Sequence, residues 1–517
     1  VIPWHFFRRL AVVYIAVVVL MTLAISPYFS VGWDPQIFAG VGRAIIDDNA
    51  IFDLYQASRQ QWGDWGFPYP PLYAHLLAPL IGATSLIPLL PDWLMVRAAP
   101  VAFDLAVAVL LYLVVLQRYG TRWQARLAPI LWLFNPLTLY QTAIQAHQEA
   151  SWLACVVAAY ALIGSRNWQG RQRDGLPRLL VEAAVLPSLL MACAVTLKQS
   201  AILFSIPYSV YLLFDRRQRP LRLAMAAVLF ALVFGGLSLP YHRHSPDFFY
   251  LVFVDVSNMP VQTQSAVVWL LGLKGYLIDQ TRSTFLLLRY QAPITMGLAG
   301  LVALLALRRD RDLFRVGLLT ALLFFLTSKK VMGYHYVLLL PFLLAWALPR
   351  HRFDLVSIAV VAASWIIVSP YFAPWAKPEH LPLYAAIGTL NTLLWLWLFI
   401  HVWRDGGHIR LGDINVTARL ASGGVALVAI MIITVGMVLS SLVQPWAAGP
   451  PLVQAALLVG VLTGALVLAP FIVLLLVGSK VLVLRGHILL ALLLVPVYFA
   501  AFALTQESTR IIEGLLP

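Results

Sequence analysis

Residues 6–35 read FFRRLAVVYIAVVVLMTLAISPYFSVGWDP, and this stretch decides the fold class. The apolar run after Arg8 and Arg9 has about the 20 residues that a helix needs to cross a bilayer. Arginines in front of a first span favour a cytoplasmic N-terminus. The stretch therefore predicts a membrane helix that delivers Asp34 to the non-cytoplasmic side.

The composition extends this conclusion to the whole chain. Of 517 residues, 61% are hydrophobic and 11% are charged, whereas a soluble chain carries about 25% charged residues. The net charge of +14 comes from short arginine clusters between apolar runs, which is the positive-inside pattern and not a nucleic-acid footprint. Cys155 and Cys193 both lie within apolar runs, so no disulfide framework is predicted.

The apolar runs predict an all-α polytopic membrane protein with about 13 to 15 transmembrane helices. Every second connection is basic, as a consistent topology requires. Residues 71–90 are apolar enough to span, but a span there would place the later basic clusters outside. They also contain Pro79, Gly82 and Pro88, so an interfacial or re-entrant segment is predicted.

Two external loops follow from this topology, at residues 30–70 and 241–284. In the first, apolar residues from Ile37 to Ile45 recur at helical spacing, which predicts an amphipathic helix on the membrane surface. In the second, His242 and His244 at i, i+2 spacing have no third histidine nearby and are a poor metal signal. Residues after 410 offer no chemistry.

Asp34 is the first candidate for chemistry. A carboxylate just beyond a span is partly desolvated while it still faces the loop, which suits a general base. An N-cap for a helix that begins at Pro35 is the alternative, and the two roles can coexist.

Cations form a second group of candidates. Lys198 ends an apolar run on the external side, and Lys329, Lys330 and His335 follow another such run. Lysines placed against the positive-inside trend suit an anionic ligand such as a phosphate leaving group, although lysines also snorkel to lipid headgroups.

Further polar groups occupy the same predicted side. Arg97 and Asp104 share one helix face; Arg97 lies near the external end, and Asp104 is better explained as a structural polar contact. His147 and Gln148 occupy a tight turn where they could reach a sugar hydroxyl, and Glu149 is predicted to be a solvated turn residue.

Taken in order, these landmarks resemble the GT-C superfamily of lipid-phosphosugar glycosyltransferases. The likeness is to dolichyl-phosphate-glucose-dependent glucosyltransferases, and also to polyprenyl-phosphate-mannose-dependent mannosyltransferases and GPI mannosyltransferase I. The matching pieces are Asp34 to Arg43, Tyr69-Pro70-Pro71-Leu72, Arg97 with Asp104, Phe134-Asn135-Pro136, Ala146-His147-Gln148, Leu197-Lys198-Gln199 with Pro207, and Thr327-Ser328-Lys329-Lys330-Val331 with His335.

The resemblance implies a helical bundle and an inverting transferase whose base is an acidic residue of the first external loop, a position that Asp34 matches. Residues 1–410 would form the catalytic region and 411–517 would add transmembrane helices. The donor phosphate would be bound by Lys198, Lys329, Lys330, Arg97 and His335. The sugar or acceptor would contact His147, Gln148, Gln199 and Tyr69.

The expected reaction moves mannose or glucose from a polyprenyl-phosphate sugar to a glycan, glycolipid or protein acceptor, outside a bacterial inner (plasma) membrane. No cofactor is expected, and the sequence leaves a divalent metal ion open. A transporter or flippase of a lipid-linked or anionic substrate is the alternative. Such proteins carry inverted repeats and broken helices, and we see one possible break, near 199–201.

Overall fold

Helices make up the part of the chain that can be described. In the computed structural model that part is residues 2–25, 33–62, 66–87, 90–118, 122–164, 184–214, 219–245, 247–255, 290–328, 330–368 and 381–405. Within those ranges the chain forms α-helices with short 3₁₀ and π segments, and no strand. The predicted all-α class is therefore confirmed there. The helices predicted after residue 410 and most of the second external loop lie outside the described residues.

Four helical segments among the described residues are long and apolar enough to cross a membrane. They are Trp4–Leu23, Asp92–Gln117, Pro220–His244 and Gln291–Asp310. They comprise α1 (Trp4–Ile25), α5 with α6 (Asp92–Met95, Ala98–Gln117), α14 with η5 and α15 (Arg219–Phe230, Ala231–Gly235, Gly236–His244) and α20 (Gln291–Asp310). The prediction of a polytopic membrane protein is therefore confirmed.

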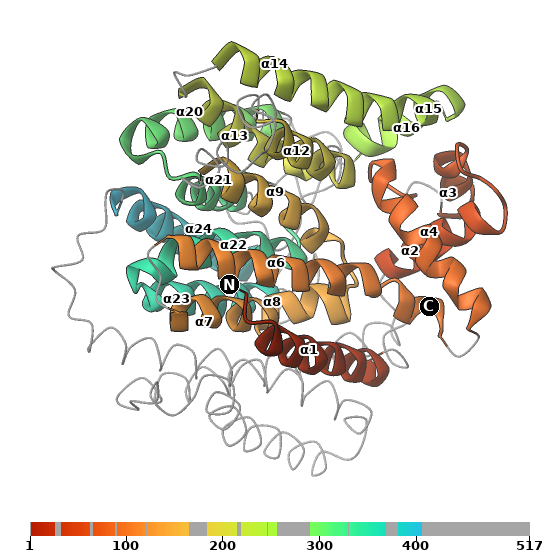
Figure 1. The fold of residues 1–517 in the computed structure, drawn as a ribbon, viewed down its shortest axis with the longest axis horizontal. Coiled ribbons are helices and arrows are strands. Elements are labelled where there is room, and N and C mark those ends of the chain that lie inside the picture. The colour runs from red at the N-terminus through yellow and green to blue at the C-terminus, as the bar shows by residue number, and fades with distance from the viewer. Residues whose placement is uncertain are drawn as a thin grey trace, which may run out of the picture.

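Shorter helices fill the space between these spans. The apolar ones are α4 (Pro71–Leu86), α9 (Glu149–Gly164), α12 (Val185–Leu197), α13 (Ile202–Phe214), α21 (Leu313–Thr327) and α23 (Phe353–Val368). The others are α2 (Trp33–Ile46), α3 (Leu54–Trp62), α7 (Arg122–Leu133), α8 (Pro136–Leu139), η2 (Tyr140–Ile144), η4 (Gln199–Ala201), α16 (Asp247–Phe249), η6 (Tyr250–Asp255), η7 (Gly333–Leu338), α22 (Leu339–Ala347), η8 (Leu348–Arg350) and α24 (Leu381–Arg404). Figure 1 shows α2, α3 and α4 gathered on one side of the bundle and α14 along another edge.

The first external loop contains helices, but α2 does not rest its apolar face on lipid as the sequence suggested. Its side chains Ile37, Phe38 and Val41 are buried, and α2 packs against α4. The approach is close at Gly42, where an added Cβ would stand 2.6 Å from Ile81 Cγ1. The apolar stripe of α2 is therefore buried against other helices of the protein. The α4 helix has 16 residues and contains Pro79, so it is shorter than a bilayer span.

A broken helix leads into the centre of the molecule over residues 122–144. The Asn135 carboxamide oxygen accepts from the backbone N–H groups of Leu137 and Thr138, which caps α8 after α7 has ended. The π-helix η2 follows, and Ala146 then adopts a φ of 48°. This left-handed turn is unusual for a residue with a Cβ, and it directs residues 147–149 into the core before α9 begins.

Asp104 has the structural role expected of it. Its carboxylate accepts hydrogen bonds from the Tyr14 hydroxyl (2.5 Å) and the Thr142 hydroxyl (2.6 Å). These bonds connect α6 to α1 and η2 inside the bundle.

An ion cluster joins three helix ends away from residues 147–149. Asp312 caps α21, and its carboxylate pairs with Arg118 at the end of α6 and with Arg350 at 3.4 Å. Burial raises the pKa of Asp312, but the two guanidiniums lower it further, to about 2. The 15 residues of α21, about 22 Å of helix, separate this cluster from Ser328 at the other end of α21.

Replacing Asp312 with asparagine is expected to lower stability in detergent by about 2 to 3 kcal/mol at neutral pH, because the two guanidiniums lose their counter-ion. Since the pKa of Asp312 is depressed in the folded state, its stabilisation is present above the unfolded pKa of about 3.9 and is lost as the pH falls toward about 2. Melting temperatures of wild type and D312N, followed by tryptophan fluorescence, should therefore converge on acidification. A gap that stays constant down to about pH 2 would contradict this assignment.

Candidate active site

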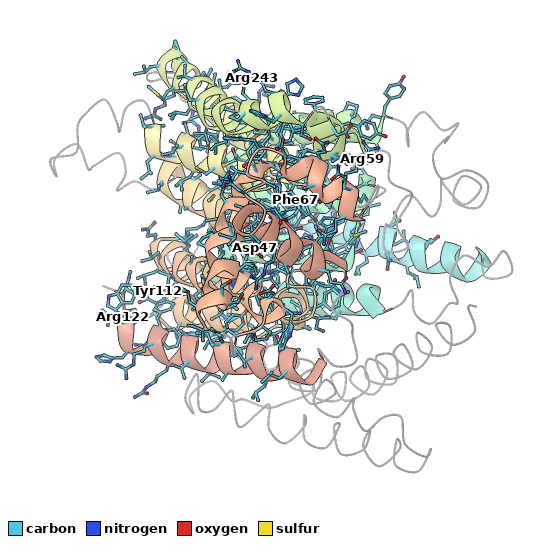
Figure 2. The ribbon with its side chains drawn as sticks, turned by 90° about the vertical axis from the view of Figure 1, so that its right-hand side faces the viewer. Asp47, Arg59, Phe67, Tyr112, Arg122 and Arg243 are labelled. Carbon is cyan, nitrogen blue, oxygen red and sulfur yellow. The ribbon has the colours of Figure 1, made fainter. Side chains whose placement is uncertain are left out.

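Asp34 stands at the first turn of α2, with Pro35 after it, where a short polar side chain favours helix initiation. Its carboxylate is 26% exposed, and its Oδ2 lies 3.8 Å from Nε2 of His147. The helix begins at Trp33 and not at Pro35, so Asp34 lies within its first turn, where it borders the buried segment at the start of α9. Figure 2 looks onto the α2–α4 side of the molecule, where Phe67 and Asp47 lie over the middle of the view.

His147, Gln148 and Glu149 are all buried, and the prediction that Glu149 is a solvated turn residue was wrong. The Glu149 carboxylate is hydrogen-bonded to the Lys198 ammonium, and it accepts from the Trp152 indole N–H at 2.5 Å. The positive φ of Ala146 turns this segment inward, and Lys198 supplies the charge that makes a buried carboxylate tolerable.

Lys198 lies between α12 and η4 in an extended conformation. Its ammonium stands 5.3 Å from the ring centroid of Tyr69 and 5.2 Å from that of Tyr334, in cation–π contact with both. Burial lowers the pKa of this ammonium, while Glu149 and Asp34 raise it. The charge of Lys198 is thus already matched by a carboxylate of the protein.

Aromatic rings hold His147 in place. The Tyr69 hydroxyl lies 3.0 Å from Nε2 of His147, and the Tyr334 ring stacks on the imidazole with centroids 3.6 Å apart. Burial lowers the pKa of His147, as does Lys198, so the neutral imidazole is favoured.

His335 approaches the same carboxylate from η7. Its Nε2 is 3.7 Å from Glu149 Oε1, and its Nδ1 accepts the Met332 backbone N–H at 3.0 Å. Burial lowers the pKa of His335 well below its ordinary value. Lys330 is half-buried between α21 and η7, and Lys329 lies outside the described residues.

Other predicted site residues bind the backbone. The Arg97 guanidinium donates to the carbonyls of Ala143 (2.8 Å), Ile144 (3.3 Å) and Trp93, so it secures the end of η2. The Gln199 amide donates to the carbonyls of Pro68 (2.9 Å) and Val252 (3.2 Å).

The Gln148 carboxamide has hydrogen-bonding capacity that the described residues of the protein do not use. Its side-chain nitrogen and oxygen are both buried and have no hydrogen-bond partner within the described part of the chain. Buried amides are nearly always paired, so Gln148 is available for a ligand hydroxyl.

The structure therefore brings Asp34, Tyr69, His147, Lys198 and His335 into one cluster, which we call the helix-end cluster, with Glu149 and Tyr334 added. Sequence reasoning missed these two. The sequence did hold a signal for Glu149: it is a carboxylate at the start of an apolar run, just as Lys198 is a cation at the end of one, and two such opposite charges can pair. Over the residues that can be described, no three His, Cys, Asp or Glu side chains are grouped to hold a metal ion.

Comparison with known proteins gives a family. The model of Glycosyltransferase family 87 matches residues 67–328, about half of the chain. The crystal structure of ArnT from Cupriavidus metallidurans in the apo state is similar with a TM-score of 0.46 and 17% sequence identity, covering 96% of this chain and 76% of that chain. No curated protein matches. The matched segment includes every member of the helix-end cluster except Asp34, Tyr334 and His335, and the chain belongs to glycosyltransferase family 87, a membrane glycosyltransferase family of the GT-C type.

Proposed function

We propose that this glycosyltransferase transfers a hexose, mannose or glucose, from a polyprenyl-phosphate sugar to a glycan, glycolipid or protein acceptor with inversion. The observation that carries the proposal is the contrast between two carboxylates. Glu149 is 0% exposed and paired with Lys198, whereas Asp34 keeps 26% of its side chain exposed beside the same group of residues. Of the two, Asp34 is the one that an acceptor hydroxyl can reach.

The chemistry is a single displacement. Asp34 takes the proton of the acceptor hydroxyl while that oxygen attacks the anomeric carbon from the face opposite the phosphate. The bond from the anomeric carbon to the phosphate oxygen breaks, and its electron pair leaves with the lipid phosphate. The product sugar therefore has the opposite anomeric configuration to the donor sugar.

The leaving phosphate needs positive charge beyond Lys198, whose ammonium is matched by Glu149. Lys330 is a further cation close to the cluster, since its charge lowers the pKa of His335. Lys329 beside it in sequence would add to this. We assign Lys198, Lys329, Lys330 and His335 to the phosphate side of the reaction, and Tyr69, His147 and Gln148 to the sugar or acceptor. Arg97 and Gln199 hold the chain segments around the site in place by donating hydrogen bonds to backbone carbonyls.

A non-cytoplasmic active site is supported by the distribution of charge. Arginines gather at the Asp312 end of α21, where Arg118 and Arg350 pair with Asp312 and Arg352 pairs with Asp405. Arginine-rich ends face the cytoplasm in membrane proteins. The helix-end cluster lies at the other end of α21, and this favours an outward-facing site in a bacterial inner membrane.

The Lys198→Met variant is expected to raise the KM for the lipid-phosphate donor about tenfold or more, because a charge-assisted hydrogen bond to phosphate is worth about 1.5 to 3 kcal/mol. The acceptor KM should change less. Steady-state kinetics with each substrate varied in turn measures both. An unchanged donor KM would remove Lys198 from the phosphate site.

The donor class is tested directly with purified protein in detergent. Radiolabelled polyprenyl-phosphate-mannose, polyprenyl-phosphate-glucose and the corresponding nucleotide sugars are each incubated with lipid and peptide fractions as acceptors. We expect transfer from a lipid-phosphate donor alone. Transfer from a nucleotide sugar, or from neither class, would overturn the proposal.

A further inference from the structure

The Glu149 carboxylate is the meeting point of four side chains from three parts of the chain. Its Oε1 is bonded to the Lys198 ammonium and lies 3.3 Å from His147 Nδ1 and 3.7 Å from His335 Nε2. Its Oε2 accepts from Trp152. Because both of its oxygens are occupied by donors of the protein, Glu149 has no oxygen left for a substrate.

We infer that Glu149 is a positioning residue that keeps the buried Lys198 protonated and holds His147 in the tautomer whose Nε2 faces Tyr69 and Asp34. This inference rests on the proposed function for its catalytic meaning, although its charge state can be tested without activity. Glu149 Oε1 lies 3.3 Å from His147 Nδ1, so its negative charge favours the proton on Nδ1, and the Nε2 lone pair is then left to accept the Tyr69 hydroxyl at 3.0 Å.

The need for Glu149 follows from what happens during turnover. The groups that face Lys198 are Asp34 on α2, Tyr69 before α4, His147 and Glu149 at the start of α9, and Tyr334 and His335 in η7. Within this set only Asp34 and Glu149 are carboxylates. Once Asp34 takes the acceptor proton it no longer carries a negative charge. Glu149 then remains the one constant counter-ion for the ammonium that faces the departing phosphate.

Removing the charge but not the shape of Glu149 tests this role. In Glu149→Gln, burial acts on Lys198 without its main counter-ion, so the Lys198 pKa falls further below the unfolded value of about 10.4. A base with a depressed folded pKa binds fewer protons folded than unfolded, so stability rises with pH across that window. The apparent melting temperature of E149Q, relative to wild type, is therefore expected to increase from about pH 6 to about pH 9.

Two further variants separate this effect from a general loss of packing. E149Q/K198M removes both charges of the pair and should lose the pH slope relative to wild type. D312N breaks a buried ion cluster elsewhere; it should lower the melting temperature without any slope between about pH 6 and about pH 9.

Activity adds the second readout. E149Q should lose roughly 30-fold or more in kcat/KM for the donor at about pH 8 and recover part of this loss as the pH is lowered, because acidification favours the protonated form of Lys198. D312N, normalised to folded protein, should follow the wild-type pH profile. Both the slope in E149Q and its loss in the double variant support the inference. A melting temperature and an activity ratio that do not depend on pH in E149Q would overturn it, even if the wild type proves to use another donor.

Discussion

Asp34→Asn is expected to lower the transfer rate by about 10² to 10⁴-fold, the range that general base catalysis contributes. An amide in the first turn of α2 fills the same volume as the carboxylate, so folding and donor binding should persist. Single-turnover transfer from bound radiolabelled donor measures the chemical step, and equilibrium binding of the same donor measures what is retained.

A matched control for Asp34 exists in the same segment. Asp48 is an exposed carboxylate just after α2, so Asp48→Asn changes the charge of the loop by the same amount. We expect D48N to transfer at the wild-type rate. If D34N kept its activity, or if D48N lost as much as D34N, Asp34 would not be the base.

Gly42→Ala is expected to cost about 10²-fold in kcat although it lies two turns from Asp34. The new Cβ would stand 2.6 Å from Cγ1 and 2.9 Å from Cβ of Ile81, so α2 must move away from α4. Arg43, which is bonded to both carboxylate oxygens of Asp92 at 2.9 and 2.8 Å, would shift with it. A displacement of about 1 Å at a catalytic group has an effect of this size.

The neighbouring glycine provides the control. At Gly82, on the other side of the same helix pair, an added Cβ would meet only the Ile46 side chain, at 3.4 Å from its terminal Cδ1. G82A should therefore keep near wild-type kcat, and the double variant G42A/I81A should recover part of the loss by opening space. Initial rates per folded protein test both. Wild-type kcat in G42A would mean that the α2–α4 contact does not hold Asp34 in its catalytic position.

Much of the candidate site was predictable because charged and polar side chains are costly near a membrane and therefore need a reason there. Asp34, Lys198 and His335 are polar groups at the ends of apolar runs, and a consistent topology brings every second end to the same side of the bundle. Helix ends that are far apart in sequence then meet, as they do around His147. The all-helical class followed from the apolar runs alone.

The errors have a common cause in tertiary contacts that leave no local pattern. Glu149 resembled a solvated turn residue because nothing in the sequence announces the positive φ of Ala146, which turns the segment inward. The contacts of Arg97, whose guanidinium donates to the carbonyls of Ala143 and Ile144 at the end of η2, likewise depend on packing and leave no local pattern. Which partner satisfies a buried charge depends on how the helices pack.

The anomeric configuration of the product is the measurement that tests the single-displacement account most directly. Wild-type protein would be given a lipid-phosphate hexose of known configuration and an acceptor from the donor assay, and the new linkage would be assigned by NMR coupling constants. Direct attack by a hydroxyl activated by Asp34 predicts complete inversion. Retention of configuration would contradict it, because retention requires a covalent sugar–enzyme intermediate or a front-face attack, and neither is a single displacement with Asp34 as the base.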